Sequence, residues 1–328
     1  MYMKNFWFDL PKPFFALAPL ANVTDAAFRR VIAKYSKTAG AAPYVTYTEF
    51  VSADGLMLAG EEGRAKLMRD LLFTEAERPI VAQFFTSNPE HMEKAATLAQ
   101  ELGFDGVDIN MGCPDKSIEK QGAGAKLILN PALAQELIAA AKRGAPNLPV
   151  SVKTRLGYNK DILDEWLPML LAAKPAAIIV HARTRKEMSK VPARWERIKR
   201  AAEIRNNHQG ETLIIGNGDV FDVADAKKKA AESGADGVML GRAIFGRPWL
   251  FSNSGELENI PIEKKLAVAV EHTKLFEELL GDIKSFAIMK KHFKAYCEGF
   301  PGAKELRIKL MEAETAGEVE QVVEGWLK

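Results

Sequence analysis

Short hydrophobic runs alternate with amphipathic segments along the first three quarters of the chain. The runs are rich in Val, Ile, Phe and Leu, as expected of strands that are buried on both faces of a parallel sheet. The intervening segments have helical spacing, most clearly at Pro89–Leu102 and Pro131–Lys142, and each of these begins with a proline, which favours the first helical turn. The pattern predicts eight strands: Phe14–Leu20, Tyr44–Phe50, Pro79–Phe85, Phe104–Asn110, Leu148–Lys153, Ala176–His181, Thr212–Gly216 and Asp236–Leu240.

This alternation fits either a closed (β/α)8 barrel or an open, doubly wound sheet. Eight units in about 240 residues match the barrel, whose usual size is about 250 residues. A dinucleotide-binding open sheet needs a glycine-rich turn after its first strand, but the turn here, APLANVTD (Ala18–Asp25), has no glycine. We therefore predict an α/β fold in which residues 1–251 form a TIM barrel.

The pattern changes after Phe251, where SNSGELENIP (Ser252–Pro261) reads as a polar linker. The rest of the chain has helical spacing throughout. We predict a small all-helical domain over residues 252–328, appended to the barrel. Its helices are expected at Glu263–Leu280, Ile283–Cys297, Ala303–Ala313 and Gly317–Leu327.

Composition narrows the class of protein only moderately. The chain has 328 residues, 47% of them hydrophobic, and its formal net charge of +2 excludes neither RNA nor small substrates. Its two cysteines, Cys113 and Cys297, form no disulfide framework and no zinc cluster, so we expect a reducing cytoplasm and no metal. No run approaches the roughly 18 apolar residues of a membrane span, and the N-terminus does not resemble a signal peptide, so we expect no membrane partner.

Barrel enzymes place their chemistry at the C-terminal ends of the strands, and polar groups are expected there in this chain. Gln83, Lys153 and His181 are donors that could orient the acceptor edge of a flavin ring. GNGD (Gly216–Asp219) and LGRAIFGRP (Leu240–Pro248), after the last two strands, could offer backbone N–H groups to a phosphate. A lone lysine or histidine at a strand end is more often a structural side chain, and a glycine-rich loop alone is as often a simple turn as a phosphate site. Their convergence on one mouth favours a flavin site.

Cys113 lies between a glycine and a proline directly after a predicted barrel strand. An isolated cysteine is more often a small buried hydrophobe than a catalytic group, but this position suits catalysis better than packing. An ordinary thiol, with a pKa of about 8.5, could act as a general acid near neutrality. It could equally be a nucleophile if its pKa were depressed. Cys297, inside a helical stretch, is interpreted as a packing residue.

With these residues assembled, the chain resembles the dihydrouridine synthase family over nearly its whole length. The opening segment APLANVTDAAFR (Ala18–Arg29) is similar to the family's flavin motif. A series of motifs that match in order is far more specific than any single motif. The other matching motifs are VAQFF (Val81–Phe85), DINMGCP (Asp108–Pro114), GAGAKLI (Gly122–Ile128), VKTRLG (Val152–Gly157), VHARTR (Val180–Arg185), GNGDV (Gly216–Val220), MLGRAIFGRPWLF (Met239–Phe251) and FPGAKELR (Phe300–Arg307).

The resemblance implies an FMN enzyme that uses NADPH to reduce uridine in RNA, most simply tRNA, to 5,6-dihydrouridine. Hydride would pass from the reduced flavin to C6 of uracil, and Cys113 would supply the proton to C5. Asn110 and Arg155 would contact the target base. Pro19, Leu20 and Ala21 would contact the flavin, Gln83 and Lys153 would bond its ring, and His181 would lie beside it. The ribityl-phosphate end would be held by Asn217, Gly218, Asp219, Gly241 and Arg242.

Two basic clusters could track an RNA backbone. Arg183–Arg205 holds nine basic and three acidic residues, and Lys284–Lys309 holds seven basic and two acidic ones. Charge alone favours solvated helix faces, but the first cluster follows a barrel strand and the second lies on the appended helices. We therefore predict RNA contacts from Arg183, Arg185, Lys290, Lys291 and Lys294.

Two other readings remain open. The first is an FMN barrel dehydrogenase that acts on a free pyrimidine such as dihydroorotate, which activity on free uracil or uridine would reveal. The second is a non-catalytic RNA-binding protein, which would be colourless when purified and would still bind tRNA. The expected oligomeric state is a monomer.

Overall fold

The computed structural model describes residues 5–38, 40–208, 210–252 and 260–328. Its centre is a closed barrel of parallel strands in the order β1 to β8, in which β8 pairs with β1 and closes the ring. The closed ring confirms the predicted barrel and rules out the open sheet. The strands are β1 (Phe14–Leu17), β2 (Tyr44–Ser52), β3 (Ile80–Phe85), β4 (Gly106–Met111), β5 (Val150–Arg155), β6 (Ala177–His181), β7 (Leu213–Asn217) and β8 (Gly237–Leu240).

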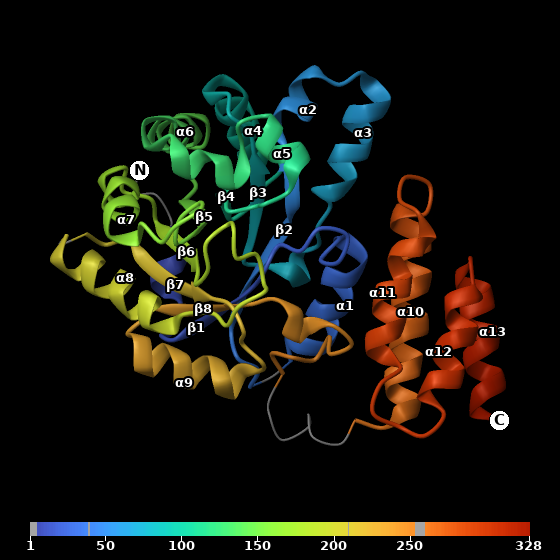
Figure 1. Ribbon diagram of the computed structural model, residues 1–328. Helices are drawn as coiled ribbons and strands as arrows, with labels where there is room; N and C mark the ends of the chain where they lie inside the picture. The colour runs from blue at the N-terminus through green and yellow to red at the C-terminus, as the bar shows by residue number, and fades with distance from the viewer. Residues whose placement is uncertain (1–4, 39, 209, 253–259) are drawn as a thin grey trace.

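Helices surround the barrel between successive strands (Figure 1). The α-helices of this layer are α1 (Ala26–Ser36), α2 (Ala53–Leu58), α3 (Glu61–Asp70), α4 (Pro89–Glu101), α5 (Lys116–Lys120), α6 (Pro131–Gly144), α7 (Leu163–Ala172), α8 (Trp195–Asn207) and α9 (Val223–Ser233). Short 3-10 turns are η1 (Phe6–Asp9), η2 (Glu75–Glu77), η3 (Gly124–Leu129) and η4 (Arg242–Ile244).

The predicted helix starts at the two prolines are confirmed. α4 begins after Asn88, whose Oδ1 accepts the backbone N–H groups of Glu90 and His91. α6 begins after Asn130, whose Oδ1 accepts the N–H of Leu133. In each case an asparagine cap satisfies free N–H groups, and the proline occupies a position where no N–H is needed.

Side chains fill the interior of the barrel and close the end at which the strands begin. Phe14 and Ala16 point inward from β1, while Phe15 and Leu17 alternate outward against α1. Trp7 of η1 has 1% of its surface exposed, and its ring lies 5.5 Å from the ring of Phe14. The N-terminal ends of the strands are therefore plugged. The opposite end, the barrel mouth, is free to carry chemistry.

Among the described residues, four α-helices follow the barrel: α10 (Ile262–Leu280), α11 (Met289–Tyr296), α12 (Ala303–Glu312) and α13 (Ala316–Leu327). We call them the C-terminal helices, and Figure 1 shows them standing beside α1. Ala27 of α1 shares their hydrophobic cluster with Leu266 and Phe293. Because the two parts share this core, the domain boundary at residue 251 stays a prediction. Most of the predicted linker, residues 253–259, lies outside the described residues.

One predicted helix is wrong in its first turn. The continuous helix expected over Ile283–Cys297 is replaced by a turn, then by the 3-10 turn η6 (Phe286–Ile288), and only then by α11. Ser285 stops the helix because its hydroxyl accepts the N–H of Ala287. Within the described part of the chain, no helix is both long and apolar enough to cross a lipid bilayer.

Candidate active site at the barrel mouth

A chain of buried hydrogen bonds runs across the inner parts of β3, β4 and β5 and ends at Cys113. Asp108 accepts from the hydroxyl of Ser151 through Oδ1, and from Nε2 of Gln83 through Oδ2 at 2.7 Å. The amide oxygen of Gln83 accepts from Nδ2 of Asn110 at 2.9 Å. Oδ1 of Asn110 then accepts the backbone N–H of Cys113 at 2.9 Å. The carboxylate therefore fixes both amide groups, and they fix the start of the cysteine loop.

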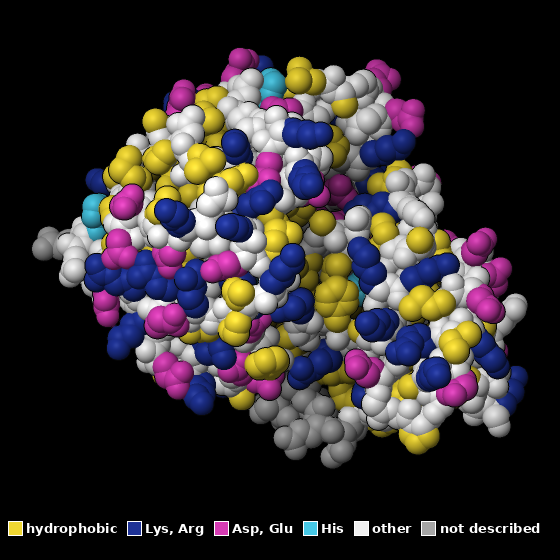
Figure 2. Space-filling model, viewed as in Figure 1, with side chains coloured by type: hydrophobic (Ala, Val, Ile, Leu, Met, Phe, Trp, Pro, Cys, Tyr) yellow, Lys and Arg dark blue, Asp and Glu magenta, His cyan; other side chains and the backbone are white. Residues whose placement is uncertain are grey.

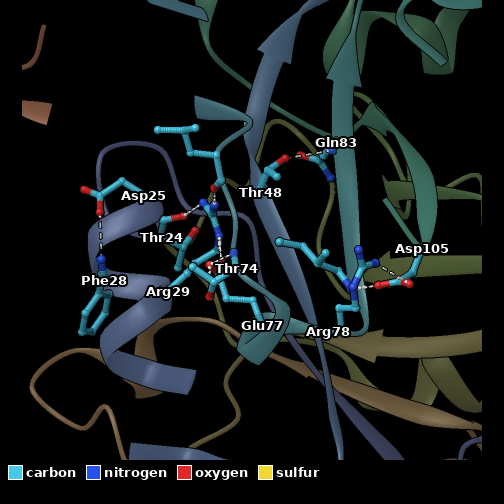
Figure 3. Close-up of polar contacts among 12 residues, drawn as sticks. Thr24, Asp25, Phe28, Arg29, Thr48, Thr74, Glu77, Arg78, Gln83 and Asp105 are labelled. Carbon is cyan, nitrogen blue, oxygen red and sulfur yellow. Dashed lines mark hydrogen bonds and ion pairs between the residues drawn. The ribbon is translucent and has the colours of Figure 1, made fainter. Parts of the chain in front are cut away.

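Asp108 and Thr48 also belong to this network, although neither was expected from the sequence. Burial raises the pKa of Asp108 to about 6, and the hydroxyl of Thr48 accepts the backbone N–H of Gln83 at 3.0 Å (Figure 3). The available signal was a polar residue inside an otherwise apolar strand. Gln83 itself is wholly buried. Its amide oxygen and one Nε2 hydrogen are already used, so only the second hydrogen could reach a ligand.

Cys113 is half-buried on a small apolar cluster. Burial raises the pKa of its thiol, so Sγ keeps its proton at neutral pH. Gly124 makes this packing possible: its φ is +62°, and a Cβ there would lie 2.8 Å from the carbonyl oxygen of Cys113. A protonated thiol favours the general-acid reading over the nucleophile reading. The cluster consists of Phe85, Ile118 and Ala123, with Phe50 packed against it.

Arg155 supports the cysteine loop from the other side. Its Nε donates to the carbonyl of Gly112 at 2.7 Å, and its Nη1 donates to the carbonyls of Thr184 and Met188, each at 3.2 Å. Only 8% of the residue is exposed, and burial lowers the pKa of Arg155 to about 10. Its main visible role is to hold the backbone before Cys113. The predicted contact with the base stays a prediction.

Lys153 and His181 lie on neighbouring strands, β5 and β6. Burial, followed by the charge of Arg155, lowers the pKa of Lys153 to about 8. Burial and Arg155 also hold the pKa of His181 well below its usual range, so the imidazole is neutral. Nη1 of Arg183 lies 3.2 Å from Nε2 of His181. Because a guanidinium only donates, Nε2 accepts and Nδ1 carries the proton.

The glycines at the ends of β7 and β8 have different surroundings. Gly218 has φ +124°, and a Cβ there would lie 2.8 Å from Cβ of Ala193 and 3.1 Å from the His181 ring. Asn217 is fixed by donating to the carbonyl of Met239 at 2.8 Å. Gly241 faces more open space, because its nearest neighbour to a Cβ would be 3.7 Å away. The end of β7 is therefore packed by the protein itself, and the backbone at the end of β8 is the more open to a bound group.

Asp219 joins two arginines at the same end of the mouth. One carboxylate oxygen accepts from Arg183, and the other accepts from Nη2 of Arg242 at 2.7 Å. Despite burial, the hydrogen bond from Arg183 lowers the pKa of Asp219. The side chain of Arg242 remains 66% exposed. A carboxylate repels phosphate, so Asp219 serves by aiming Arg242, and Arg242 is the cation that could meet an anionic ligand.

The β1–α1 loop (residues 18–25) carries the other predicted flavin contacts. Pro19 is buried, Leu20 is half-buried and Ala21 is exposed. The N–H of Leu20 donates to the hydroxyl of Thr24 at 2.8 Å, and the carbonyl of Leu20 accepts the N–H of Thr24 at 3.0 Å. The loop is therefore a closed turn with a defined shape.

A buried ion pair anchors this loop to the barrel wall. Nε of Arg29 lies 2.8 Å from Oε2 of Glu77, and neither side chain has exposed surface. Arg29 also donates to the carbonyls of Thr24, at 2.9 Å, and Leu72. Figure 3 shows the guanidinium between Thr24 and Glu77, with Thr74 on the far side of the carboxylate. Arg29 was not among the residues selected from sequence, because its partners are distant in the chain.

The first predicted RNA-binding cluster is largely neutralised. Arg183 is 3% exposed and points at Asp219, so its predicted contact with RNA is not carried forward. Arg185 donates to both carboxylate oxygens of Glu119 and stacks over Tyr158. The other ion pairs join the arginines at positions 194, 197, 200 and 205 to Asp161, Asp164, Glu187, Glu203 and Asp236.

The lysines of the second basic cluster that lie on α11 are not neutralised by ion pairs. Lys290 is half-buried, Lys291 and Lys294 are exposed, and none of the three has an ion-pair partner among the described residues. Figure 2 shows Lys and Arg side chains on both sides of the furrow between the barrel and the C-terminal helices, with hydrophobic side chains along its floor. This face suits a polyanion better than the arginine cluster does.

Comparison with solved structures agrees with the barrel. Histamine dehydrogenase from Rhizobium sp. 4-9 has a TM-score of 0.54 and 11% identity over 80% of this chain and 48% of that chain. At that identity the likeness shows the fold alone.

Sequence comparison is far more specific. The family model of dihydrouridine synthase (Dus) matches residues 16–328. The "Probable tRNA-dihydrouridine synthase 2" of Bacillus subtilis (strain 168) is 40% identical over 323 residues, which covers 98% of this chain and 96% of the relative. The "Probable tRNA-dihydrouridine synthase" of Staphylococcus aureus (strain MRSA252) is 38% identical over 98% of this chain and 95% of the relative. The chain therefore belongs to the dihydrouridine synthase family.

Proposed function

We propose that the protein reduces uridine in tRNA to 5,6-dihydrouridine, with FMN as cofactor and NADPH as reductant, and that it acts as a monomer. The observation that carries the proposal is the position of Cys113 at the barrel mouth, on a loop held by Asn110 on one side and by Arg155 on the other, where burial raises the pKa of its thiol. The names of the relatives supply the substrate class.

The residues at the mouth fit an FMN. Lys153 has no hydrogen-bond partner among the described residues, and burial has already lowered its pKa. It could therefore stabilise charge at the ring edge, beside the neutral His181. Arg242 is exposed yet aimed by Asp219, and the preceding Gly241 faces more open space, so a phosphate group would find a cation and N–H donors there. When bound, the flavin supplies the hydride for C6 of uracil.

Cys113 completes the reduction by protonating C5 of the uracil. Addition of hydride at C6 leaves an electron pair that develops at C5 and on the adjoining carbonyl. The S–H bond of Cys113 breaks, its proton forms the new C–H bond at C5, and the thiolate is left behind. The raised pKa keeps the proton available at neutral pH, and the lowered pKa of Lys153 gives a neighbouring donor that could return one.

The furrow beside α11 supports an RNA substrate. A target uracil must leave its stack before it can reach the mouth, at a cost of a few kcal/mol. Phosphate contacts from the unpaired lysines of α11 would offset part of that cost. A free base would gain nothing from this surface.

The test is dihydrouridine formation. Purified protein is incubated with FMN, NADPH and unmodified tRNA, and the digested nucleosides are read by mass spectrometry for a gain of two hydrogens. Cys113→Ala is expected to bind FMN but to lose about 100-fold or more in turnover on tRNA, the range of general acid catalysis. The matched control is Cys297→Ala, which alters the buried cysteine of the C-terminal helices and should keep turnover.

Two results would contradict the proposal. Normal turnover by Cys113→Ala would remove the thiol as proton donor. Reduction of free uridine or uracil at the rate seen with tRNA would favour a free-pyrimidine enzyme instead.

A further inference from the structure

One lysine of the C-terminal region forms ion pairs with the barrel and its surrounding helices. Lys284, in the turn between α10 and α11, has only 13% of its side chain exposed. Its Nζ lies 2.6 Å from Oε2 of Glu49 on β2 and 2.7 Å from Oδ1 of Asp70 at the end of α3. Although burial opposes it, the two carboxylates raise the pKa of Lys284, so it stays charged. This lysine, counted in the second basic cluster, is therefore not an RNA contact.

Glu49 connects Lys284 to the β1–α1 loop. Its second carboxylate oxygen, Oε1, accepts the backbone N–H of Asn22. Asn22 has φ +55°, a left-handed conformation that asparagine adopts more readily than most residues. The bond therefore fixes the turn directly after Ala21. Glu49 is 5% exposed, so water does not readily replace Asn22 as its partner.

We propose that Lys284 and Glu49 are positioning residues for the flavin: through Glu49, the C-terminal region holds the β1–α1 loop in the shape that binds the cofactor. The inference rests on the proposed function, because it takes residues 19–21 to be flavin contacts. It assigns the C-terminal region a second task besides binding RNA, which is to complete the cofactor site.

The charges around Lys284 show why replacing this lysine would change the β1–α1 loop. Asp25, which caps α1 at the end of the same loop, has its pKa raised to about 7 by burial and by the charge of Glu49. Without the ammonium group, the carboxylates of Glu49 and Asp70 repel each other in a poorly hydrated place. Glu49 then turns away from Asp70, and its bond to Asn22 weakens.

A general role in attaching the helices to the barrel can be separated from this one. Arg69 on α3 also joins the two parts: it donates to the carbonyl of Leu279 at 2.7 Å and pairs with Asp282 at 3.1 Å. Arg69 has no bond to Glu49 or to the β1–α1 loop in the described residues. Arg69→Met is therefore a matched control, since it loosens the same interface without reaching the loop.

The experiment titrates FMN into the full-length apoprotein and follows the quenching of flavin fluorescence. Lys284→Met and Glu49→Ala should each raise the dissociation constant about tenfold, and Lys284→Arg should restore most of the affinity. Arg69→Met should leave it unchanged. If the two residues act as one unit, the double variant should bind FMN about as well as either single variant, because coupled residues are not additive.

The inference is overturned if Lys284→Met binds FMN as tightly as the native protein, if Arg69→Met weakens binding equally, or if the two single effects add in the double variant. Should Lys284→Met fail to fold, by circular dichroism, the comparison of Glu49→Ala with Arg69→Met decides the question. A native protein that binds no FMN would instead refute the proposed function, so the two failures are distinct.

Discussion

Replacing Arg29 with methionine keeps much of the side chain's volume but removes its charge and three hydrogen bonds. The native guanidinium donates to Glu77 at 2.8 Å and to the carbonyls of Thr24 and Leu72. Both charged side chains are wholly buried. The substitution leaves the carboxylate of Glu77 with only the N–H and hydroxyl of Thr74, in a place that water does not reach.

The expected cost is large. Removing one partner of a buried ion pair costs about 3–5 kcal/mol, because the remaining charge loses its compensation. The entropy of unfolding is about 2.1 cal/mol/K per residue, which is about 0.7 kcal/mol/K for 328 residues. The melting temperature of Arg29→Met should therefore fall by about 4–7 °C. FMN affinity should fall as well, since Arg29 holds the loop at Thr24.

Calorimetry at pH 7 measures the melting temperature, and a double variant tests the reason for its change. Adding Glu77→Met removes the stranded charge, so the double variant should be more stable than Arg29→Met alone, although unpaired backbone groups still cost about 1–3 kcal/mol. Arg200→Met, which breaks an exposed pair with Asp164, is the control and should cost about 0–1 kcal/mol. A double variant that is as unstable as the sum of both single variants would refute the reasoning.

Three further predictions concern acid stability, the cysteine loop and RNA. His272 and His292 are wholly buried between α1 and the C-terminal helices; burial holds the pKa of His272 well below its usual range and lowers that of His292 to about 3. Their stabilising effect is complete above the unfolded pKa of about 6.5 and is lost as pH falls towards 3, so urea unfolding should show about 3 kcal/mol less stability at pH 5.5 than at pH 7.5. Gly124→Ala forces a side chain at φ +62° against the carbonyl of Cys113 and should lower kcat on tRNA about tenfold or more. Changing the three lysines of α11 to alanine should weaken tRNA binding, measured by filter binding at several salt concentrations, and should reduce the salt slope by about 2–3.

Each of these three predictions has a matched control or an outcome that would contradict it. His292→Leu should roughly halve the dependence of stability on pH, and an unchanged dependence would mean that the pair is not its source. Gly317→Ala, where a Cβ would meet no atom within 4 Å, should not affect turnover. Lys227→Ala with Lys228→Ala, on α9, should leave the salt slope as it is. Equal slopes for the α11 variant and the native protein would remove that helix from the RNA interface.

The barrel was predictable because its signal is local. Strand runs such as Phe104–Asn110 needed only apolar side chains between turn residues, and β4 was found within two residues of the expected bounds. The expected helix over Ile283–Cys297 failed because apolar spacing continues through the turn. What breaks the helix is the cap of Ser285 and the diversion of Lys284 towards β2, and the partners of Lys284 are more than 200 residues away.

The candidate site was predictable as a set of positions but not as a set of contacts. Convergence of strand ends placed Cys113, Lys153 and His181 at one mouth, because barrel geometry demands it. The charge count could not show that Arg183 would be buried against Asp219, which is 36 positions along the chain. The role of Arg29 could not be predicted for the same reason, because its partner Glu77 lies on a different segment. Charge pairing over long sequence distances is decided by the fold.

The closure of β1 against β8 has a consequence for synthesis of the protein. The β1–α1 loop leaves the ribosome well before β8, which pairs with β1, and before the α10–α11 turn, which is linked to the loop through Glu49. At about 5–20 residues per second, translation takes roughly 10–45 s to pass from β1 to β8. During that interval β1 has no partner on its β8 side, and chaperones could hold it. We therefore expect a nascent chain stalled before the α10–α11 turn to bind FMN more weakly than the native protein does.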